Sequence, residues 1–359
     1  MKGIGRRDFI KFSGLSTLGL FAATLHPMLT FGLQKFKIAW SHYTGWEPWE
    51  YARHAGIIKK WADKYGIEIE LSKPLDYTES MNLYNIGQYD GVVVTNMDML
   101  ISPALAGKDS TAIIIGDFSN GNDGICLKNS ETVADIKGRK AYMVMGSVTQ
   151  YLFSRMCSLN AIKEKDVKLF NASESDIVSL FSEDKNPMIA VGTWNPYLMQ
   201  VRNLPKTKMI FDSSKIPGEI IDMLIVRTDA SDTLKKALTG AWFETMQIMG
   251  GAGKEAKEAK KFMANTAGCV ESEFESQLKT TAIFYTPAEA VEFTKSQKLR
   301  ETMEYVRTFC FDHGLYGKGI KNKDYVGIQF PDGSIIGDKQ NIKMRFDATY
   351  MQMAAEGKL

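Results

Sequence analysis

Acidic and aromatic side chains, but no basic ones, gather in five short segments of this chain. The segments are 41–49, 95–98, 116–124, 146–149 and 192–196, and together they hold four acidic residues and three tryptophans but no lysine or arginine. A carboxylate accepts charge-assisted hydrogen bonds worth about 1.5–3 kcal/mol each, and an indole face attracts a cation by roughly 0.5–2 kcal/mol. Nitrate, sulfonate or phosphate would instead favour arginine, lysine or Gly/Ser-rich helix starts. The segments therefore favour a site for a small planar cation, such as an amidine or a guanidinium group.

The candidate residues divide into carboxylates, aromatic walls and polar neighbours. The full candidate ligand-binding set is Asp98, Trp194, Trp46, Asp222, Asn96, Asp117, Tyr43, Asp123, Ser147, Asn195 and Trp49. Structural roles compete for several of these residues. Asp98 could cap a helix that begins near Met99. Asp117 and Asp123 lie in a Gly/Asn/Ser-rich loop where Asx turns are common, and Trp49 could belong to a core.

Alternating strands and helices must position these segments. Ligands of open α/β sheets bind beyond the carboxyl ends of the strands, which is where the five segments fall. Apolar or alternating runs predict strands at 36–40, 67–71, 92–95, 113–115, 140–144, 167–170, 188–191, 209–211 and 221–226. Helical spacing predicts helices at 48–64, 148–160, 174–182 and 196–203. The pattern is that of an α/β protein with a parallel sheet in each unit.

The order of these elements predicts two lobes joined by a hinge of two segments. We expect the chain to cross between lobes near 118–126 and 213–224, with the ligand in the cleft between them. The expected divisions are a leader at 1–33, domain I at 34–120 plus 222–320, domain II at 121–221, and a C-terminal hairpin and tail at 321–359. Residues 231–313 read as almost entirely helical, with Ser231 as an N-cap and Pro287 in a first turn. A hairpin is expected around Pro331, Asp332 and Gly333.

The N-terminus carries an export signal. Arg6 and Arg7 precede an apolar run at 12–25 that is too short to span a bilayer. This pattern predicts a twin-arginine leader and a periplasmic protein, with Thr30-Phe31-Gly32 as the nearest cleavage candidate. An ordinary secretory signal or an uncleaved membrane tether remains the alternative.

Composition excludes several classes of function. The leader has a net charge of +3 and the whole chain has +2, so the mature part is nearly neutral. It therefore shows no basic surface of the kind that binds nucleic acid. Cys126, Cys157, Cys269 and Cys310 form no zinc or dithiol motif, although Cys269 and Cys310 could pair in an oxidising compartment. The mature histidines have no metal-ligand spacing. We therefore expect no metal, no cofactor and no enzymatic activity.

The same segments carry a family likeness over roughly residues 36–310. Its motifs are Tyr43-Thr44-Gly45-Trp46 with Pro48-Trp49, Thr95-Asn96-Met97-Asp98, the stretch 116–124 and Thr193-Trp194-Asn195-Pro196. The chain resembles the ABC-transporter solute-binding proteins found with urea carboxylase, a branch of the nitrate/sulfonate/taurine-type periplasmic binding proteins. The resemblance implies a two-lobed fold of the type II periplasmic kind, and a monomer that hands a small nitrogen compound to an ABC permease and its ATPase. Among such compounds, the acidic and aromatic segments favour guanidine over neutral urea.

Other functions stay open for a chain of this kind. A taurine, sulfonate or nitrate binder shares the implied fold, but the missing basic residues disfavour it. Pyrimidine-precursor synthases of thiamine biosynthesis also share it, but they resemble one another through a cluster of adjacent cysteines and an active-site histidine, and this sequence has no such cluster. A periplasmic sensor that presents its lobes to a receptor is a third alternative.

Overall fold

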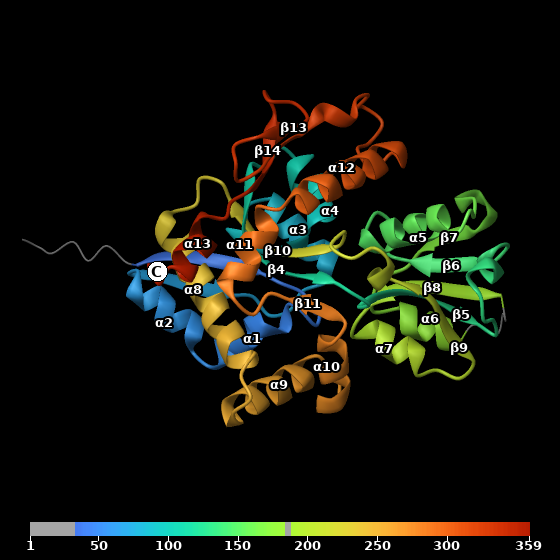
Figure 1. Cartoon of the computed structure of the whole chain (residues 1–359), viewed down its shortest axis with the longest axis horizontal. Helices are drawn as coiled ribbons and strands as arrows, with labels where there is room; N and C mark the ends of the chain where they lie inside the picture. The colour runs from blue at the N-terminus through green and yellow to red at the C-terminus, as the bar shows by residue number, and fades with distance from the viewer. Residues whose placement is uncertain (1–32, 184–187) are drawn as a thin grey trace, which may run out of the picture. The chain divides into compact units, whose positions relative to one another are not determined.

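Two β-sheets organise the computed structural model, which describes residues 33–183 and 188–359 (Figure 1). The predicted leader, including Arg6, Arg7 and the cleavage candidate, lies outside the described residues. The larger sheet contains β1 (Gln34–Ala39), β2 (Ile67–Leu71), β3 (Gly91–Thr95), β4 (Ser110–Ser119), β10 (Ile221–Arg227), β11 (Thr281–Ile283), β12 (Gly327–Gln329), β13 (Ile335–Ile336) and β14 (Ile342–Phe346). The smaller sheet contains β5 (Asp123–Lys128), β6 (Lys140–Met143), β7 (Lys168–Asn171), β8 (Ile189–Trp194) and β9 (Thr207–Asp212). We call the parts built on these sheets the larger and the smaller lobe.

The larger sheet is mixed, whereas the sequence predicted a parallel one. Its strands run in the order β13-β12-β14-β4-β10-β3-β1-β2, with β11 paired to β4. β10 is antiparallel to both of its neighbours, β3 and β4. The reason is topological, because β10 enters the larger sheet from the smaller lobe and lies between β3 and β4. The interior strands carry wholly buried runs such as Val92 to Val94, as expected of strands covered on both faces.

The smaller sheet has the order β7-β6-β8-β5-β9. Three helices pack around it, namely α5 (Val148–Leu159), α6 (Ile177–Glu183) and α7 (Tyr197–Arg202). The chain enters this lobe between β4 and β5, at residues 120–122, and leaves it between β9 and β10, at residues 213–220. Both crossings fall inside the ranges expected from the sequence. The two-lobed α/β prediction is confirmed, while the residue boundaries of the domains stay a prediction.

Helices cover the larger lobe. They are α1 (Glu47–His54), α2 (Ile57–Lys64), α3 (Tyr77–Asn85), α4 (Asn96–Met99), α8 (Asp232–Met249), α9 (Lys254–Thr266), α10 (Glu271–Leu278), α11 (Pro287–Thr294), α12 (Gln297–Asp312) and α13 (Thr349–Ala355). The helix expected at 48–64 is two helices, because Gly56 adopts a left-handed conformation with φ of 73° between them. Ser231 caps α8 through the amide of Leu234, and Pro287 begins α11, as predicted.

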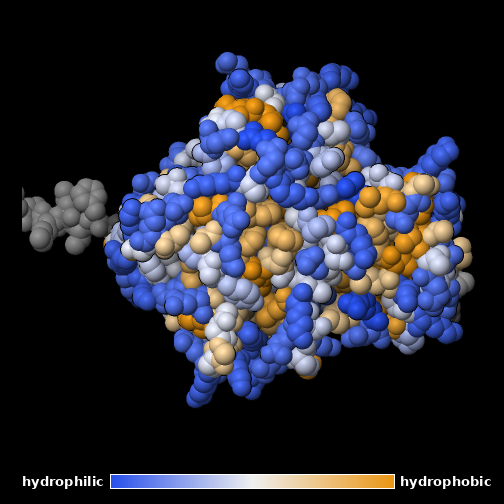
Figure 2. Space-filling model, in the orientation of Figure 1, coloured by the Kyte–Doolittle hydropathy of each residue, from blue (hydrophilic) through white to orange (hydrophobic). Residues whose placement is uncertain are grey.

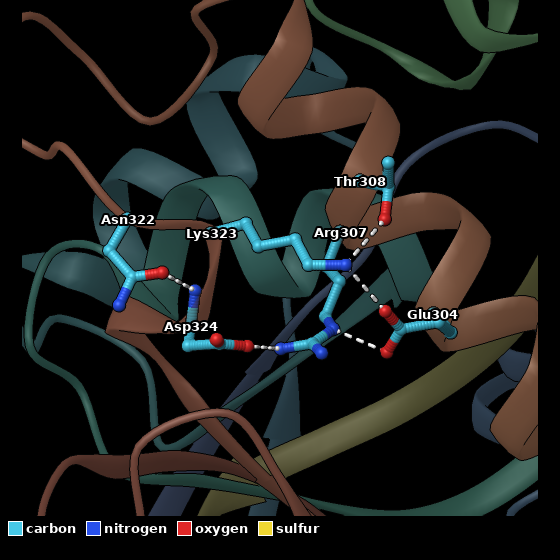
Figure 3. A network of polar contacts seen from close by, with 6 residues as sticks. All are labelled: Glu304, Arg307, Thr308, Asn322, Lys323 and Asp324. Atoms are coloured by element: carbon cyan, nitrogen blue, oxygen red, sulfur yellow. Dashed lines mark hydrogen bonds and ion pairs between the residues drawn. The ribbon is translucent and has the colours of Figure 1, made fainter.

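The tail belongs to the larger sheet. The predicted hairpin forms from β12 and β13, and β14, which the sequence did not reveal, lies parallel to both β12 and β4. Arg307 of α12 ties the tail to the helices, since its buried guanidinium donates to Glu304 and to Asp324. Figure 3 shows Lys323 reaching the same Glu304 carboxylate from the tail side, at 2.8 Å.

The four cysteines are free, so the disulfide considered between Cys269 and Cys310 is not formed. Hydrophobic areas on the face shown in Figure 2 are interrupted by hydrophilic residues on both lobes. Within the residues that the structure describes, no helix is both long and apolar enough to cross a membrane.

Candidate ligand-binding site

A small cavity of about 20 Å³ lies where the two lobes meet. The loop after β1, the start of α3 and the end of β3 contribute from the larger lobe. The starts of β5 and α5 and the end of β8 contribute from the smaller one. Its lining residues are Ser41, Tyr43, Trp46, Tyr77, Thr95, Asp123, Val148, Trp194, Ile220 and Asp222. The cavity lies at the carboxyl ends of β1, β3 and β8, as expected from the sequence. It is bordered by Ile220 of the hinge and by Asp222 at the start of β10.

Four aromatic rings form a connected wall of this cavity. The Tyr43 and Trp46 ring centroids lie 5.2 Å apart, and those of Trp46 and Tyr77 lie 5.4 Å apart. Tyr77 then meets Trp194 of the smaller lobe edge to face at 6.1 Å. Tyr77 thus links the aromatic walls of the two lobes.

Asp117 and Asp222 form a buried carboxyl pair beside the cavity. They are register partners on the adjacent strands β4 and β10, and at most 3% of either residue is exposed. Neither oxygen of Asp117 has a hydrogen-bond partner in the structure, and one oxygen of Asp222 also has none. The backbone of Gly45 lies against Asp117 so closely that a Cβ there would be 2.3 Å from the carboxylate. Only glycine fits at this position.

A second, smaller cavity lies behind the first. Asp117, Asp222, Trp46, Trp49 and Trp242 are among its lining residues. Asp222 and Trp46 line both cavities, so they form the partition between them. The indole N–H groups of Trp46 and Trp242 have no acceptor. Unpaired donors and acceptors therefore remain around this partition.

Burial raises the pKa values of the aspartates here. It raises the pKa of Asp117 to about 7, and the charge of Asp123 adds to the effect. The pKa of Asp123 is also raised to about 7, by burial and by the charge of Asp98. Burial and the two neighbouring carboxylates raise the pKa of Asp222 well above its ordinary value. Burial is the largest cause of each shift, and no ion pair to a basic residue offsets it within residues 33–183 and 188–359.

Asp98 plays a different part from the other aspartates. Its carboxylate accepts a 2.6 Å hydrogen bond from the Tyr77 hydroxyl and a 2.7 Å bond from the Thr95 hydroxyl. Burial raises the pKa of Asp98 to about 6. Thr95, not Asp98, caps α4. Asp98 is absent from the cavity lining and holds Tyr77, which is part of it.

Several predicted residues lie outside the cavity lining. Asn96 bonds the hinge, donating to the Glu219 carbonyl and accepting from the Ile221 amide. Ser147 caps α5, and Asn195 donates to Asn122 at 2.6 Å. Trp49 packs on Trp242 with ring centroids 4.9 Å apart and lines only the inner cavity. Each of these side chains is therefore already bonded to, or packed against, other residues of the protein.

The structure adds residues that sequence reasoning did not select. Ser41, Tyr77, Thr95, Val148 and Ile220 line the cavity but are not among the candidate residues. Tyr77 follows β2, and applying the strand-end argument to that strand as well would have found it. Val148 and Ile220 carry no chemical signal, because apolar residues at a helix start and in a hinge are common everywhere.

Contacts across the lobes hold the observed arrangement. The Glu174 carboxylate of the smaller lobe accepts from the Tyr77 amide, the first of α3, at 3.1 Å. On the side of α12, His313 lies 3.0 Å from the Glu164 carboxylate. The α12 residue Thr302 donates to the Gly218 carbonyl in the hinge at 2.9 Å. The lobes therefore touch on both sides of the cavity.

Comparisons with known proteins identify the fold. No protein-family model and no curated protein matches the sequence. The structure is similar to the periplasmic aliphatic sulphonate binding protein SsuA from Escherichia coli, with a TM-score of 0.65 and 16% identity over 80% of this chain and 96% of that one. The CA3427 gene product of Candida albicans, described as exhibiting the generic periplasmic binding protein structural fold, matches with a TM-score of 0.58 and 14% identity over 77% and 91%. This chain has that fold.

A nitrate-binding relative of the fold gives a further match. The periplasmic nitrate-binding protein NrtA from Synechocystis PCC 6803 has a TM-score of 0.54 and 14% identity, covering 90% of this chain and 98% of that one. At such low identities the likeness defines the architecture, and the ligand must be argued from the site.

Proposed function

We propose that this protein is the periplasmic solute-binding component of an ABC importer and that it captures a small nitrogenous cation, guanidinium being the best match. The observation that carries the proposal is the group of buried carboxyls, Asp117, Asp123 and Asp222, which no basic residue neutralises in the described chain. Unpaired buried charges are costly, so a site of this kind suits a ligand that supplies the positive charge.

The cavity chemistry supports a cation over an anion. Its charged lining residues are Asp123 and Asp222, and its aromatic walls include Trp46 and Trp194. A nitrate or sulfonate ion would face two carboxyls without a counter-charge, whereas guanidinium offers in-plane N–H donors to each of them. Its flat faces suit the indole and phenol rings. Urea has similar N–H groups but lacks the charge that would offset the carboxylates.

Partners follow from the proposed role. A permease and its ATPase would receive the cargo, and the twin-arginine leader predicted at residues 1–33 would export the protein to the periplasm. The resemblance to binding proteins found with urea carboxylase is consistent with this assignment. We expect a monomer that closes on its ligand by a hinge motion and carries no cofactor.

Isothermal titration calorimetry tests the proposal directly. Guanidinium is expected to bind, and taurine, sulfate and nitrate are expected to give no saturable heat. Asp222→Asn should weaken guanidinium binding by at least about tenfold, or ~1.4 kcal/mol, because it removes an unpaired carboxylate. Asp63→Asn makes the same change in charge on the exposed face of α2 and should leave the affinity unchanged. Tight binding of an anion with no response to guanidinium would refute the cation assignment.

A further inference from the structure

The supply of hydrogen-bond acceptors in the main cavity does not match a bare guanidinium ion. Guanidinium carries N–H donors around its whole rim. Among the described lining residues, the hydroxyl of Ser41 and one oxygen of Asp222 are buried acceptors without a partner, and Asp123 contributes a second carboxyl. The hydroxyls of Tyr77 and Thr95 both donate to Asp98, and they already accept from the backbone amides of Thr95 and Asp98 respectively. Each N–H left without an acceptor in a buried site weakens binding.

Carbon dominates the rest of the cavity wall. Val148, the first residue of α5 in the smaller lobe, is 4% exposed. Ile220 lies in the hinge. The rings of Trp46, Tyr77 and Trp194 continue this apolar surface. Such a wall cannot hydrogen-bond an N–H group, but it packs well against a methyl group. Linked aromatic rings are also the arrangement that recognises methylated cations elsewhere.

We propose that the preferred ligand is an N-methylated guanidinium ion, with its remaining N–H edge on Asp222 and Asp123 and its methyl group against the rings and Val148. This inference rests on the proposed function and narrows it from small cations to one substituted class. Each methyl group removes an unsatisfied donor and buries apolar surface. The burial alone corresponds to about fourfold in affinity per methyl group.

Calorimetry with guanidinium, N-methylguanidinium and N,N-dimethylguanidinium tests the inference on the mature protein. We expect N-methylguanidinium to bind at least about fourfold more tightly than guanidinium, and N,N-dimethylguanidinium at least as tightly as the monomethyl ion. If guanidinium binds tightly and each methyl group weakens binding, the inference is overturned while the proposed function stands. If none of the three cations binds, the proposed function fails and the inference fails with it.

A substitution in the wall gives a second, independent measurement. Val148→Thr nearly conserves the side-chain volume and adds a hydroxyl acceptor, so it should reduce the affinity ratio between N-methylguanidinium and guanidinium. Val148→Ala adds no acceptor and should leave that ratio above one. Circular dichroism and thermal melting establish that both variants are folded. An unchanged ratio in Val148→Thr, with guanidinium still bound, would mean that missing acceptors do not decide the preference.

Discussion

At the residue scale, the carboxyls at the cavity titrate together, because the charges of neighbouring carboxylates raise their pKa values. Asp117 and Asp222 face each other across two strands, and Asp123 is close enough to raise the pKa values of both. Tyr43 stands beside all three, and their charges together with burial keep its pKa well above the ordinary value. Ionising two neighbouring buried carboxyls costs free energy, because their charges repel. The unliganded site therefore holds protons near neutral pH.

Cation binding should therefore release protons. Raising the pH through about 7, the pKa of Asp117 and Asp123, deprotonates the site and should increase the affinity for guanidinium. Calorimetry at several pH values, in buffers with different enthalpies of ionisation, measures both the affinity and the number of protons released. An affinity that falls with rising pH would contradict the assignment of these carboxyls to the site.

Stability of the unliganded protein should show the opposite trend. A carboxyl whose folded-state pKa is raised keeps more protons folded than unfolded, so its contribution is favourable below its unfolded pKa and is lost as the pH rises through the folded value. Between about pH 4 and 7 the site thus lowers the free energy of unfolding as the pH increases. Asp117→Asn should flatten this decline in melting temperature, and Asp63→Asn should not. A decline identical in all three proteins would place its origin elsewhere.

At the element scale, α12 connects parts of the molecule that are distant in sequence. It bonds the hinge through Thr302, packs Phe309 against Tyr151 of α5 at 5.1 Å between ring centroids, and holds the tail through Arg307. The sequence predicted helical structure here but not these connections. Helical spacing defines an apolar face, whereas the partner of that face depends on the path of the whole chain.

Removing the Arg307 side chain tests the attachment of the tail. Arg307→Ala should lower the free energy of unfolding by about 2 kcal/mol, because a buried guanidinium with two carboxylate partners is lost and those partners are half exposed. Arg300→Ala breaks the exposed pair with Asp332, 3.0 Å long, and should cost less than ~1 kcal/mol. Urea unfolding of the two variants provides the comparison. Equal losses would indicate that the tail gains little from the network in Figure 3.

The sequence was most informative about strand ends. The five segments chosen at strand ends carry Asp123, Trp46 and Trp194, which line the cavity. Asp222 lies outside these segments, because it is the second residue of β10. The sequence did not distinguish Asn195, which is consumed by a bond to Asn122, from a free ligand-binding amide. Nor did it reveal that β10 runs antiparallel, since a buried apolar run reads the same in either direction.

At the scale of the whole molecule, the contact between Glu174 and the Tyr77 amide ties the smaller lobe to the start of α3. This amide is one of the helix donors without a partner inside the helix, and it would face water if the lobes separated. Glu174 does not line the cavity. It can therefore influence ligand binding only through the relative position of the lobes.

Glu174→Ala should speed ligand release without altering the site itself. We expect the dissociation rate of guanidinium to increase at least about tenfold, in line with the loss of one charge-assisted hydrogen bond, and the association rate to change little. Stopped-flow tryptophan fluorescence measures both rates, and Glu183→Ala, at an exposed position on α6, is a matched control. Unchanged release would show that this contact does not stabilise the closed form.

The placement of the aspartates on different lobes has a mechanical consequence. Asp117 and Asp222 move with the larger sheet, whereas Asp123 begins β5 of the smaller one. When the empty site loses its protons, these carboxylates repel one another across the hinge. The repulsion favours separation of the two lobes. A bound cation turns the same charges into an attraction. Under the function proposed above, this repulsion would distinguish the empty form from the loaded form at the permease.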